Sequence, residues 1–179
     1  MADTLVMPEI PNQEAFNLQR WEQLCADPAL ASLDFRIETD RHGNTIKTPP
    51  PGFDHGDFQS QLVFILRQAK SGGKAVTECP ISTSEGVKAA DVAWISTERL
   101  VRSKKKNVLT VAPEICVEVI SPSNSRREID EKKHLYFEAG ADEVWICDLK
   151  GSIFIFLEDG AEAAAASRLC PSIPAKLEH

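Results

Sequence analysis

One carboxylate interrupts an apolar run in the second half of the chain. Glu118 lies within residues 115–120, which are otherwise hydrophobic, and Ser121-Pro122 ends the run. This pattern is typical of a strand covered on both faces, in which Cys116, Glu118 and Ile120 share one face. Burying an unpaired carboxylate costs several kcal/mol, so Glu118 requires a cation, a metal ion or a hydrogen-bond network.

A second acid interrupts another apolar run, at residues 89–95. Asp91 is disfavoured in a strand as well as costly to bury. If the two strands are neighbours, Asp91 and Glu118 form one site, because clustered carboxylates bind hard cations such as Mg²⁺ or Mn²⁺. The alternative is that each acid lies at a strand end, exposed or paired with an arginine.

The segment after Glu118 supplies two candidate lysines. Its apolar positions predict a helix over residues 125–139, and Lys132 and Lys133 both project within the apolar face. Such a lysine either extends to the edge of the face or points at the sheet beneath. Two acids that hold a cation and a lysine that activates water suit metal-assisted phosphodiester cleavage. Helical geometry alone does not distinguish Lys132 from Lys133.

The elements around these candidates predict an α/β domain with a mixed sheet. Helices are predicted over residues 12–26 and 54–72, with a hairpin over 34–48 between them. Strands follow at 75–81, 88–95 and around Glu118, then the helix at 125–139 and strands at 143–148 and 152–157. The order is therefore helix, three strands, helix, strand. The alanine-rich residues 161–166 fit either a helix or a loop.

Length and composition predict one domain, which we place at residues 1–176. The final Leu177-Glu178-His179 resembles the start of a polyhistidine expression tag. The 179 residues are 42% apolar and 26% charged, as in soluble globular proteins. No apolar run approaches the ~20 residues that span a bilayer, and no signal peptide is evident. We expect a cytoplasmic protein without membrane contact. Five single cysteines, with no Cys-x-x-Cys pair, argue against a disulfide framework or a zinc site.

The net charge of −7 weakens any nucleic-acid hypothesis, because proteins that bind phosphates usually carry a basic face. Basic residues cluster in a predicted loop that contains Arg99, Arg102 and Lys104-Lys105-Lys106. Such a cluster is more often a solvated turn than a phosphate clamp. The cleft of an acid-dependent nuclease is itself negative until a metal ion binds, so the charge does not exclude such an enzyme.

The motifs resemble the Uma-two family of nucleases, within the restriction-endonuclease-like PD-(D/E)XK superfamily. The resemblance is carried by residues 117–123, Glu131-Lys132, Tyr136, Ala139-Gly140 and residues 143–148. Ala90-Asp91 matches the first acid of the family, where a proline usually precedes the aspartate. The similarity extends from about Phe35 to Leu157. It implies a restriction-endonuclease-like core, to which an N-terminal helix and hairpin are added.

The resemblance also implies roles for individual residues. Asp91 and Glu118 would be metal ligands and Lys132 the catalytic lysine, because the family places a lysine four residues before the tyrosine. The Glu-x-Lys motif of the wider superfamily would put the lysine at position 120, which is isoleucine here. The lysine must therefore reach the site from the helix.

Two further residues are auxiliary candidates. Glu38 matches an early acidic position of the family, and His55 matches the start of its first core helix. For His55 the alternative is packing or capping at that helix start. Glu143 would either support the lysine or lie at a solvated strand start, and Tyr136 is predicted to be a core residue.

These observations favour a DNA endonuclease that depends on Mg²⁺ or Mn²⁺. Cutting both strands of a duplex favours a homodimer or a higher homo-oligomer. Two alternatives use the same fold. One is a catalytically silent protein that binds nucleic acid or a protein partner, and the other is a small-molecule phosphodiesterase or another metal hydrolase that uses the same acids.

Overall fold

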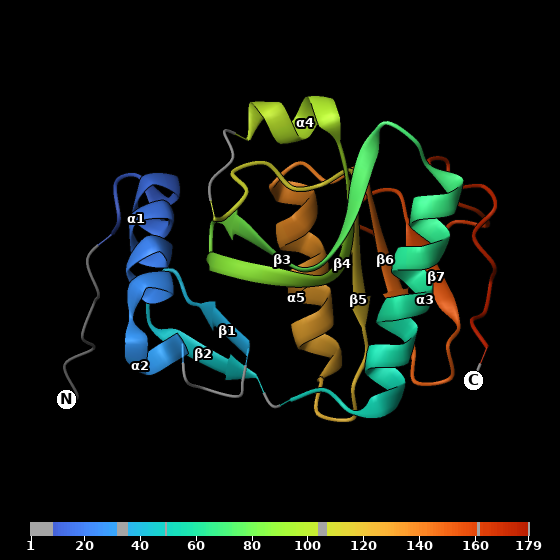
Figure 1. Cartoon of the computed structure of the whole chain (residues 1–179), viewed down its shortest axis with the longest axis horizontal. Helices are drawn as coiled ribbons and strands as arrows, with labels where there is room; N and C mark the ends of the chain where they lie inside the picture. Colours follow the sequence, from blue (N-terminus) through green and yellow to red (C-terminus); the bar gives the residue numbers. More distant parts are fainter. Residues whose placement is uncertain (1–8, 32–35, 49, 104–106, 161, 179) are drawn as a thin grey trace.

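The computed structural model describes residues 9–31, 36–48, 50–103, 107–160 and 162–178 (Figure 1). Residues 34–35 of the predicted hairpin, the three lysines at 104–106 and His179 lie outside this part of the chain. The helices are α1 (Gln13–Ala26), α2 (Pro28–Ala31), α3 (Phe53–Ala69), α4 (Thr97–Arg102) and α5 (Arg126–Glu138). The strands are β1 (Arg36–Thr39), β2 (Thr45–Thr48), β3 (Gly73–Thr83), β4 (Gly86–Ser96), β5 (Ile115–Val119), β6 (Glu143–Cys147) and β7 (Ile153–Phe156).

A mixed five-stranded sheet, in the order β3-β4-β5-β6-β7, forms the centre of the molecule. The pair β5 and β6 is parallel, with α5 as the crossover, and the other neighbouring strands are antiparallel. This confirms the predicted α/β fold with a mixed sheet. It also places the Glu118 strand in the middle of the sheet and the Asp91 strand directly beside it, as the two apolar runs predicted.

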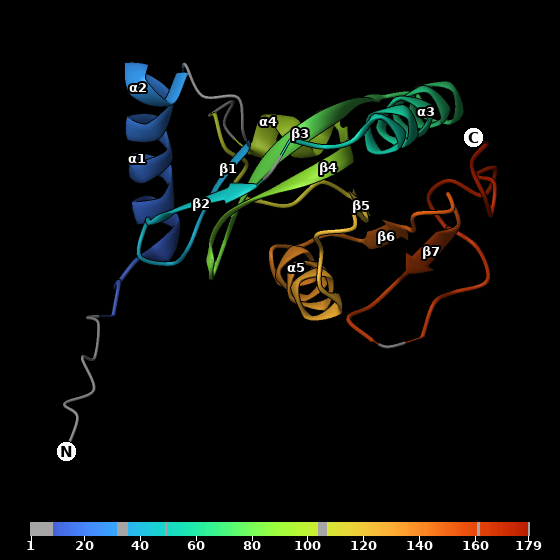
Figure 2. The same cartoon turned by 90° about the horizontal axis from the view of Figure 1, so that it is seen from below.

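The helices α3 and α5 cover opposite faces of this sheet (Figure 2). Val117 and Val119 of β5 pack with Leu62 of α3 in one core cluster. Cys116, which points the other way, packs with Tyr136 of α5 in a second cluster. Because strand side chains alternate, Glu118 shares the face of Cys116. Its carboxylate is therefore directed toward α5, the helix that carries Lys132.

Local sequence signals explain where α5 begins and ends. The Ser125 side chain accepts a hydrogen bond from the Glu128 amide (3.2 Å), as helix-capping serines do. The Asn124 side chain accepts from the Ser121 amide (2.8 Å) and fixes the turn after β5. Gly140 has φ of +100°, a left-handed conformation that ends helices and suits glycine. The predicted helix over 125–139 is thus confirmed to within one residue at each end.

The small hairpin β1–β2 docks on the start of β4. Gly86 has φ of +96°, and a Cβ atom there would lie 2.4 Å from the carbonyl oxygens of both Thr39 and Asp40. Only glycine permits this close approach of the two hairpins. The Ala89 amide in turn donates to Glu38 Oε1 (3.1 Å). This contact brings β1, with its acidic side chain, to the sheet.

The basic cluster differs from its sequence prediction, and the alanine-rich segment adopts one of its two predicted forms. Arg99 and Arg102 do not lie in a loop, because α4 contains them, with Ser96 as its cap. Arg99 pairs with Glu114 and Asp142, which neutralises it as a phosphate ligand. The alanine-rich segment is irregular over residues 162–166.

The C-terminal residues pack on the sheet. Leu177 is 4% exposed and belongs to the core cluster beneath α3, although it falls in the segment that resembles a tag. Its amide donates to the Gly151 carbonyl (2.9 Å). Within the described residues, no helix combines the length and the apolar character needed to cross a membrane.

Candidate active site

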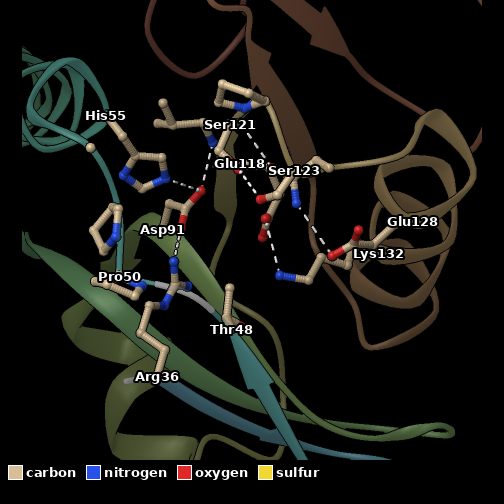
Figure 3. Close-up of a pocket in the computed structure, with 15 residues that line it drawn as sticks. Arg36, Thr48, Pro50, His55, Asp91, Glu118, Ser121, Ser123, Glu128 and Lys132 are labelled. Carbon is tan, nitrogen blue, oxygen red and sulfur yellow. Dashed lines mark hydrogen bonds and ion pairs between the residues drawn. The ribbon is translucent and has the colours of Figure 1, made fainter. Parts of the chain in front are cut away.

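A cavity of about 200 Å³ lies over β4 and β5, between the β1–β2 hairpin and the first turns of α3 and α5 (Figure 3). Its ionisable lining residues are Arg36, His55, Asp91, Glu118, Glu128 and Lys132. Four of the five predicted site residues are therefore in its wall, and the fifth, Glu38, contacts Lys132. The structure brings all five together.

Asp91 is buried in the middle of β4, with 2% of its surface exposed. Its Oδ2 accepts from the Val119 amide (2.7 Å), and its Oδ1 accepts from Arg36 Nη1 (2.5 Å). His55 Nε2 lies 3.3 Å from Oδ2. Burial raises the pKa of Asp91, but His55 and Arg36 outweigh burial and lower it. The acid is paired with an arginine, as the alternative prediction had it, yet it lies within the site and not at a strand end.

Glu118 is equally buried but is less well neutralised. Its Oε2 accepts from Lys132 Nζ (3.1 Å) and its Oε1 from the Tyr136 hydroxyl (2.6 Å). Burial, together with the nearby charges of Asp91 and Glu38, raises the pKa of Glu118 to about 8 against the attraction of Lys132. The carboxyl group is therefore poised between its two protonation states near neutral pH.

This shift predicts how stability depends on pH in a metal-free buffer. Between about pH 4.5 and 8 the native protein keeps the Glu118 proton that the unfolded chain releases. The free energy of unfolding therefore falls as the pH rises through this window and levels off above it. Glu118→Gln removes this dependence. Urea unfolding at pH 5 and pH 9 should show a larger loss of stability for the wild type than for Glu118→Gln. Equal losses would contradict the raised pKa.

Lys132 is the lysine that reaches the acids. Its Nζ lies 2.7 Å from Glu38 Oε1 and 3.1 Å from Glu118 Oε2. Burial lowers the pKa of Lys132, but the two carboxylates outweigh burial and raise it, so the side chain is charged. Lys133 points away from the cavity and donates to the Gly160 carbonyl (2.7 Å). The structure thus separates the two lysines that helical geometry left equivalent.

Three residues were not predicted from the sequence to act at the site: Tyr136, Arg36 and Glu78. Tyr136 is fully buried, as predicted, but its hydroxyl also fixes the Glu118 carboxylate. Arg36 lies two residues before Glu38 on β1, so the alternation of a strand places both side chains on one face. That spacing was a usable signal. Glu78, an acid within the strand β3, gave the same signal as Asp91.

Glu78 has an unusual backbone. It is the one non-glycine residue with positive φ (52°) in the described part of the chain, and such residues are uncommon. The register pairs Thr77 with Val92 and Cys79 with Ala90, so Glu78 lies opposite Asp91, where no pair forms. Burial raises the pKa of Glu78, while the Arg36 charge opposes this. Backbone strain of this kind concentrates at functional sites.

Glu143 has neither of its predicted roles. It is 1% exposed, which rules out a solvated strand start. It shares a strand face with Trp145, and its carboxylate accepts from the Trp145 indole nitrogen (2.8 Å). The same carboxylate accepts from Ser167, Arg168 and Leu169. Glu143 therefore holds the C-terminal segment, because the parity of β6 directs it away from α5.

The chemistry of the cavity fits a divalent cation. Carboxyl groups outnumber fixed cations in and beside the cavity. Among the described residues, Arg36 and Lys132 are the permanently charged groups that form ion pairs with four acids, which are Glu38, Glu78, Asp91 and Glu118. With all four acids ionised, the formal excess is two negative charges, which one divalent ion would neutralise. His55 Nδ1 is also buried and has no hydrogen-bond partner among the residues that the structure describes, and such an atom calls for a water molecule or another polar group nearby.

The donor set favours a hydrated ion. Within the residues that the structure describes, no group of three or more His, Cys, Asp or Glu side chains is arranged to hold a metal ion. Ligation would therefore rest on two carboxylates, those of Asp91 and Glu118. Mg²⁺ is commonly held in this way, by one or two carboxylates with several retained water molecules.

Comparison with known proteins bears on the family and the fold of the chain. Residues 18–168 match the Uma2 family model, which is described as "Putative restriction endonuclease". A crystal structure from Anabaena variabilis ATCC 29413, titled "a putative nuclease belonging to DUF820", has the same fold, with a TM-score of 0.65 and 17% sequence identity. The match covers 80% of this chain and 88% of that one. No curated protein sequence matches the chain. The family match spans most of the sequence, and the chain therefore belongs to the Uma2 family.

Proposed function

We propose that this protein is a DNA endonuclease that requires Mg²⁺ or Mn²⁺ and hydrolyses phosphodiester bonds. One observation carries the proposal. Asp91 and Glu118, from adjacent strands, face a cavity in which acids exceed fixed cations and into which Lys132 projects its ammonium group. Family membership supports the nuclease class, and the acidic character of the cavity supports the metal requirement.

The residues of the chain divide the work of hydrolysis. Asp91 and Glu118 would hold the cation, which would supply Lewis-acid activation of the phosphoryl group and of the attacking water. Lys132 donates hydrogen bonds to the attacking water or to a phosphate oxygen, where negative charge accumulates. Glu38 holds the Lys132 ammonium group through a second ion pair, in addition to that with Glu118. Tyr136 and His55 orient the two acids through the contacts described above.

Duplex DNA, two-fold symmetry and the cellular compartment are further parts of the proposal. Double-strand cleavage requires two sites, so we infer a homodimer or a higher homo-oligomer. A bound divalent ion would offset the excess of two negative charges among the acids at the cavity, so these acids would no longer repel a phosphate group, although the chain as a whole keeps a net negative charge. The expected location is the cytoplasm.

A plasmid assay tests the proposal. With Mg²⁺ or Mn²⁺ the wild type should convert supercoiled plasmid to nicked and linear forms, and chelation should stop the reaction. Asp91→Asn should lower the cleavage rate by at least about 10³-fold, because it removes one of two charged ligands. The matched control is Asp130→Asn, on the solvent side of α5 and 57% exposed, which should cleave as the wild type does.

Other outcomes would favour the alternatives. Metal binding without cleavage of any DNA or RNA would indicate a silent binding protein or a small-molecule phosphodiesterase. Hydrolysis of bis(p-nitrophenyl) phosphate, lost in Asp91→Asn, would then select the phosphodiesterase. Cleavage that persists in Asp91→Asn with chelator present would reject the proposed mechanism.

A further inference from the structure

Arg36 binds Asp91, one of the two candidate metal ligands. Its Nη1 donates to Asp91 Oδ1 (2.5 Å) and its Nη2 to the Ala89 carbonyl (3.1 Å). Its Nε forms an ion pair with Glu78 Oε2. The guanidinium group is thus wedged between two carboxylates in the wall of the cavity, with the Arg36 side chain 18% exposed.

The Glu78 side of this contact is separately fixed. Glu78 adopts its left-handed backbone conformation opposite Asp91, and its Oε1 accepts from Gln59 Nε2 (2.8 Å). Gln59 also donates to the Asp91 carbonyl (3.1 Å). The carboxylate of Glu78 is therefore anchored independently of Arg36. It would keep its hold on Arg36 Nε if the contact with Asp91 were broken.

The position of Arg36 conflicts with a bound cation. Oδ2 of Asp91 is already engaged by the Val119 amide and approached by His55. Oδ1 is the oxygen left for a metal ion, and Arg36 Nη1 is hydrogen-bonded to it. A guanidinium does not lose its charge at any ordinary pH. Arg36 can therefore leave Oδ1 only by moving, and its planar donor pair suits a phosphate group as well as a carboxylate.

We propose that Arg36 occupies the cation's place on Asp91 in the resting protein, and that its Nη donors bind the scissile phosphodiester once Asp91 Oδ1 holds a divalent ion. Glu78 retains Arg36 Nε throughout, so the guanidinium pivots within the cavity. This inference rests on the proposed nuclease function. It assigns to one arginine both the protection of the resting site and the binding of substrate.

Two binding measurements on Arg36→Gln test the inference without reference to cleavage. Calorimetric titration with Mn²⁺ should show about tenfold tighter binding than in the wild type, because a competing charge is gone. Anisotropy with a labelled duplex oligonucleotide in Ca²⁺ should show about tenfold weaker binding, because a charged phosphate contact is gone. The matched control is Arg41→Gln, in the turn of the same hairpin, where Arg41 forms an exposed ion pair with Glu85. Neither value should change in the control.

The opposite signs of the two effects distinguish the proposal from simpler roles. If Arg36 only maintained the fold of the site, Arg36→Gln would weaken both metal and DNA binding, and the proposal would be overturned. Tighter metal binding with unchanged DNA binding would also overturn it, since Arg36 would then only block the site. A wild type that binds no Mn²⁺ would reject the proposed function itself, whereas a wild type that binds Mn²⁺ no more weakly than Arg36→Gln rejects this inference alone.

A conservative variant guards against misfolding of Arg36→Gln. Lysine keeps the charge but has a single donor head, so it cannot contact Glu78, Asp91 and the Ala89 carbonyl together. Arg36→Lys should therefore bind DNA more weakly than the wild type and Mn²⁺ more tightly, each by a smaller factor than Arg36→Gln. Wild-type values for both constants in Arg36→Lys would overturn the proposal.

Discussion

Lys132→Met is expected to lower the DNA cleavage rate by about 10²–10⁴-fold, the range for losing a proton-transfer or charge-stabilising group. Methionine fills a similar volume without the ammonium group that lies between Glu38 and Glu118. The same change leaves two buried carboxylates without their cation, so the variant should bind Mn²⁺ at least as tightly as the wild type. Loss of cleavage with retained metal binding separates a catalytic role from a ligand role.

The adjacent residue is a close control. Lys133 is also buried, at 6% exposure, but its ammonium bonds to Gly160 and lies 4.4 Å from the centre of the Phe156 ring. Lys133→Met should keep the wild-type cleavage rate within a few-fold. Lys132→Arg, which restores the charge, should recover more activity than Lys132→Met. Equal cleavage by Lys132→Met and the wild type would remove Lys132 from the mechanism, and a comparable loss in Lys133→Met would show that the assay responds to stability.

Glu143→Ala is expected to lower the free energy of unfolding by about 3–5 kcal/mol, as breaking a buried charged network does. Its carboxylate accepts from the Trp145 indole and the Ser167 hydroxyl, and from the amides of Arg168 and Leu169. Without the acid the indole of Trp145 and the hydroxyl of Ser167, both buried, lose their hydrogen-bond acceptor. The C-terminal segment, which covers the α3 side of the sheet, loses its main polar anchor.

Urea unfolding of Glu143→Ala measures this effect, and limited proteolysis locates it. Cleavage near residues 162–172 should become faster than in the wild type. Glu162→Ala, an exposed acid in the same segment, is the control and should change stability by no more than about 0.5 kcal/mol. DNA cleavage per folded molecule should be unchanged in both variants. A stability loss below about 1 kcal/mol in Glu143→Ala would show that the network contributes little.

The site combines features that oppose stability. Glu118 is buried with an unfavourable charge balance, and Glu78 has a strained backbone. Both are costly. Glu118 lines the cavity and Glu78 contacts Arg36 in the cavity wall, and such costs usually concentrate at functional sites. The Glu143 network and the two apolar clusters against α3 and α5 supply the compensating stability. The parts of the molecule that fold it and the parts that carry its chemistry are therefore largely separate.

The strands, the two core helices and three of the residues at the site were predictable from the sequence. Glu118 and Asp91 were evident because an acid in an apolar strand violates a local rule. Helical periodicity placed Lys132 and Lys133 on a buried face, and the resemblance to the Uma-two family selected Lys132. Periodicity also predicted the alternation of β5 that directs Glu118 to α5. The same local rules could not distinguish Lys132 from Lys133, since both lie within the helix face.

Which side chains contact one another depends on how the elements pack, and this was not predictable from local patterns. The docking of the β1–β2 hairpin on β4 brings Arg36 and Glu38 to the site. Arg36 contacts Asp91, which lies 55 positions further along the chain. The alternation of side chains along β6 directs Glu143 toward the C-terminal segment and away from Lys132. The left-handed backbone conformation of Glu78 was also not predictable from the sequence, because the contacts around a residue set its φ angle. Local patterns fix where a side chain points within its own element, and the packing of elements fixes what it meets there.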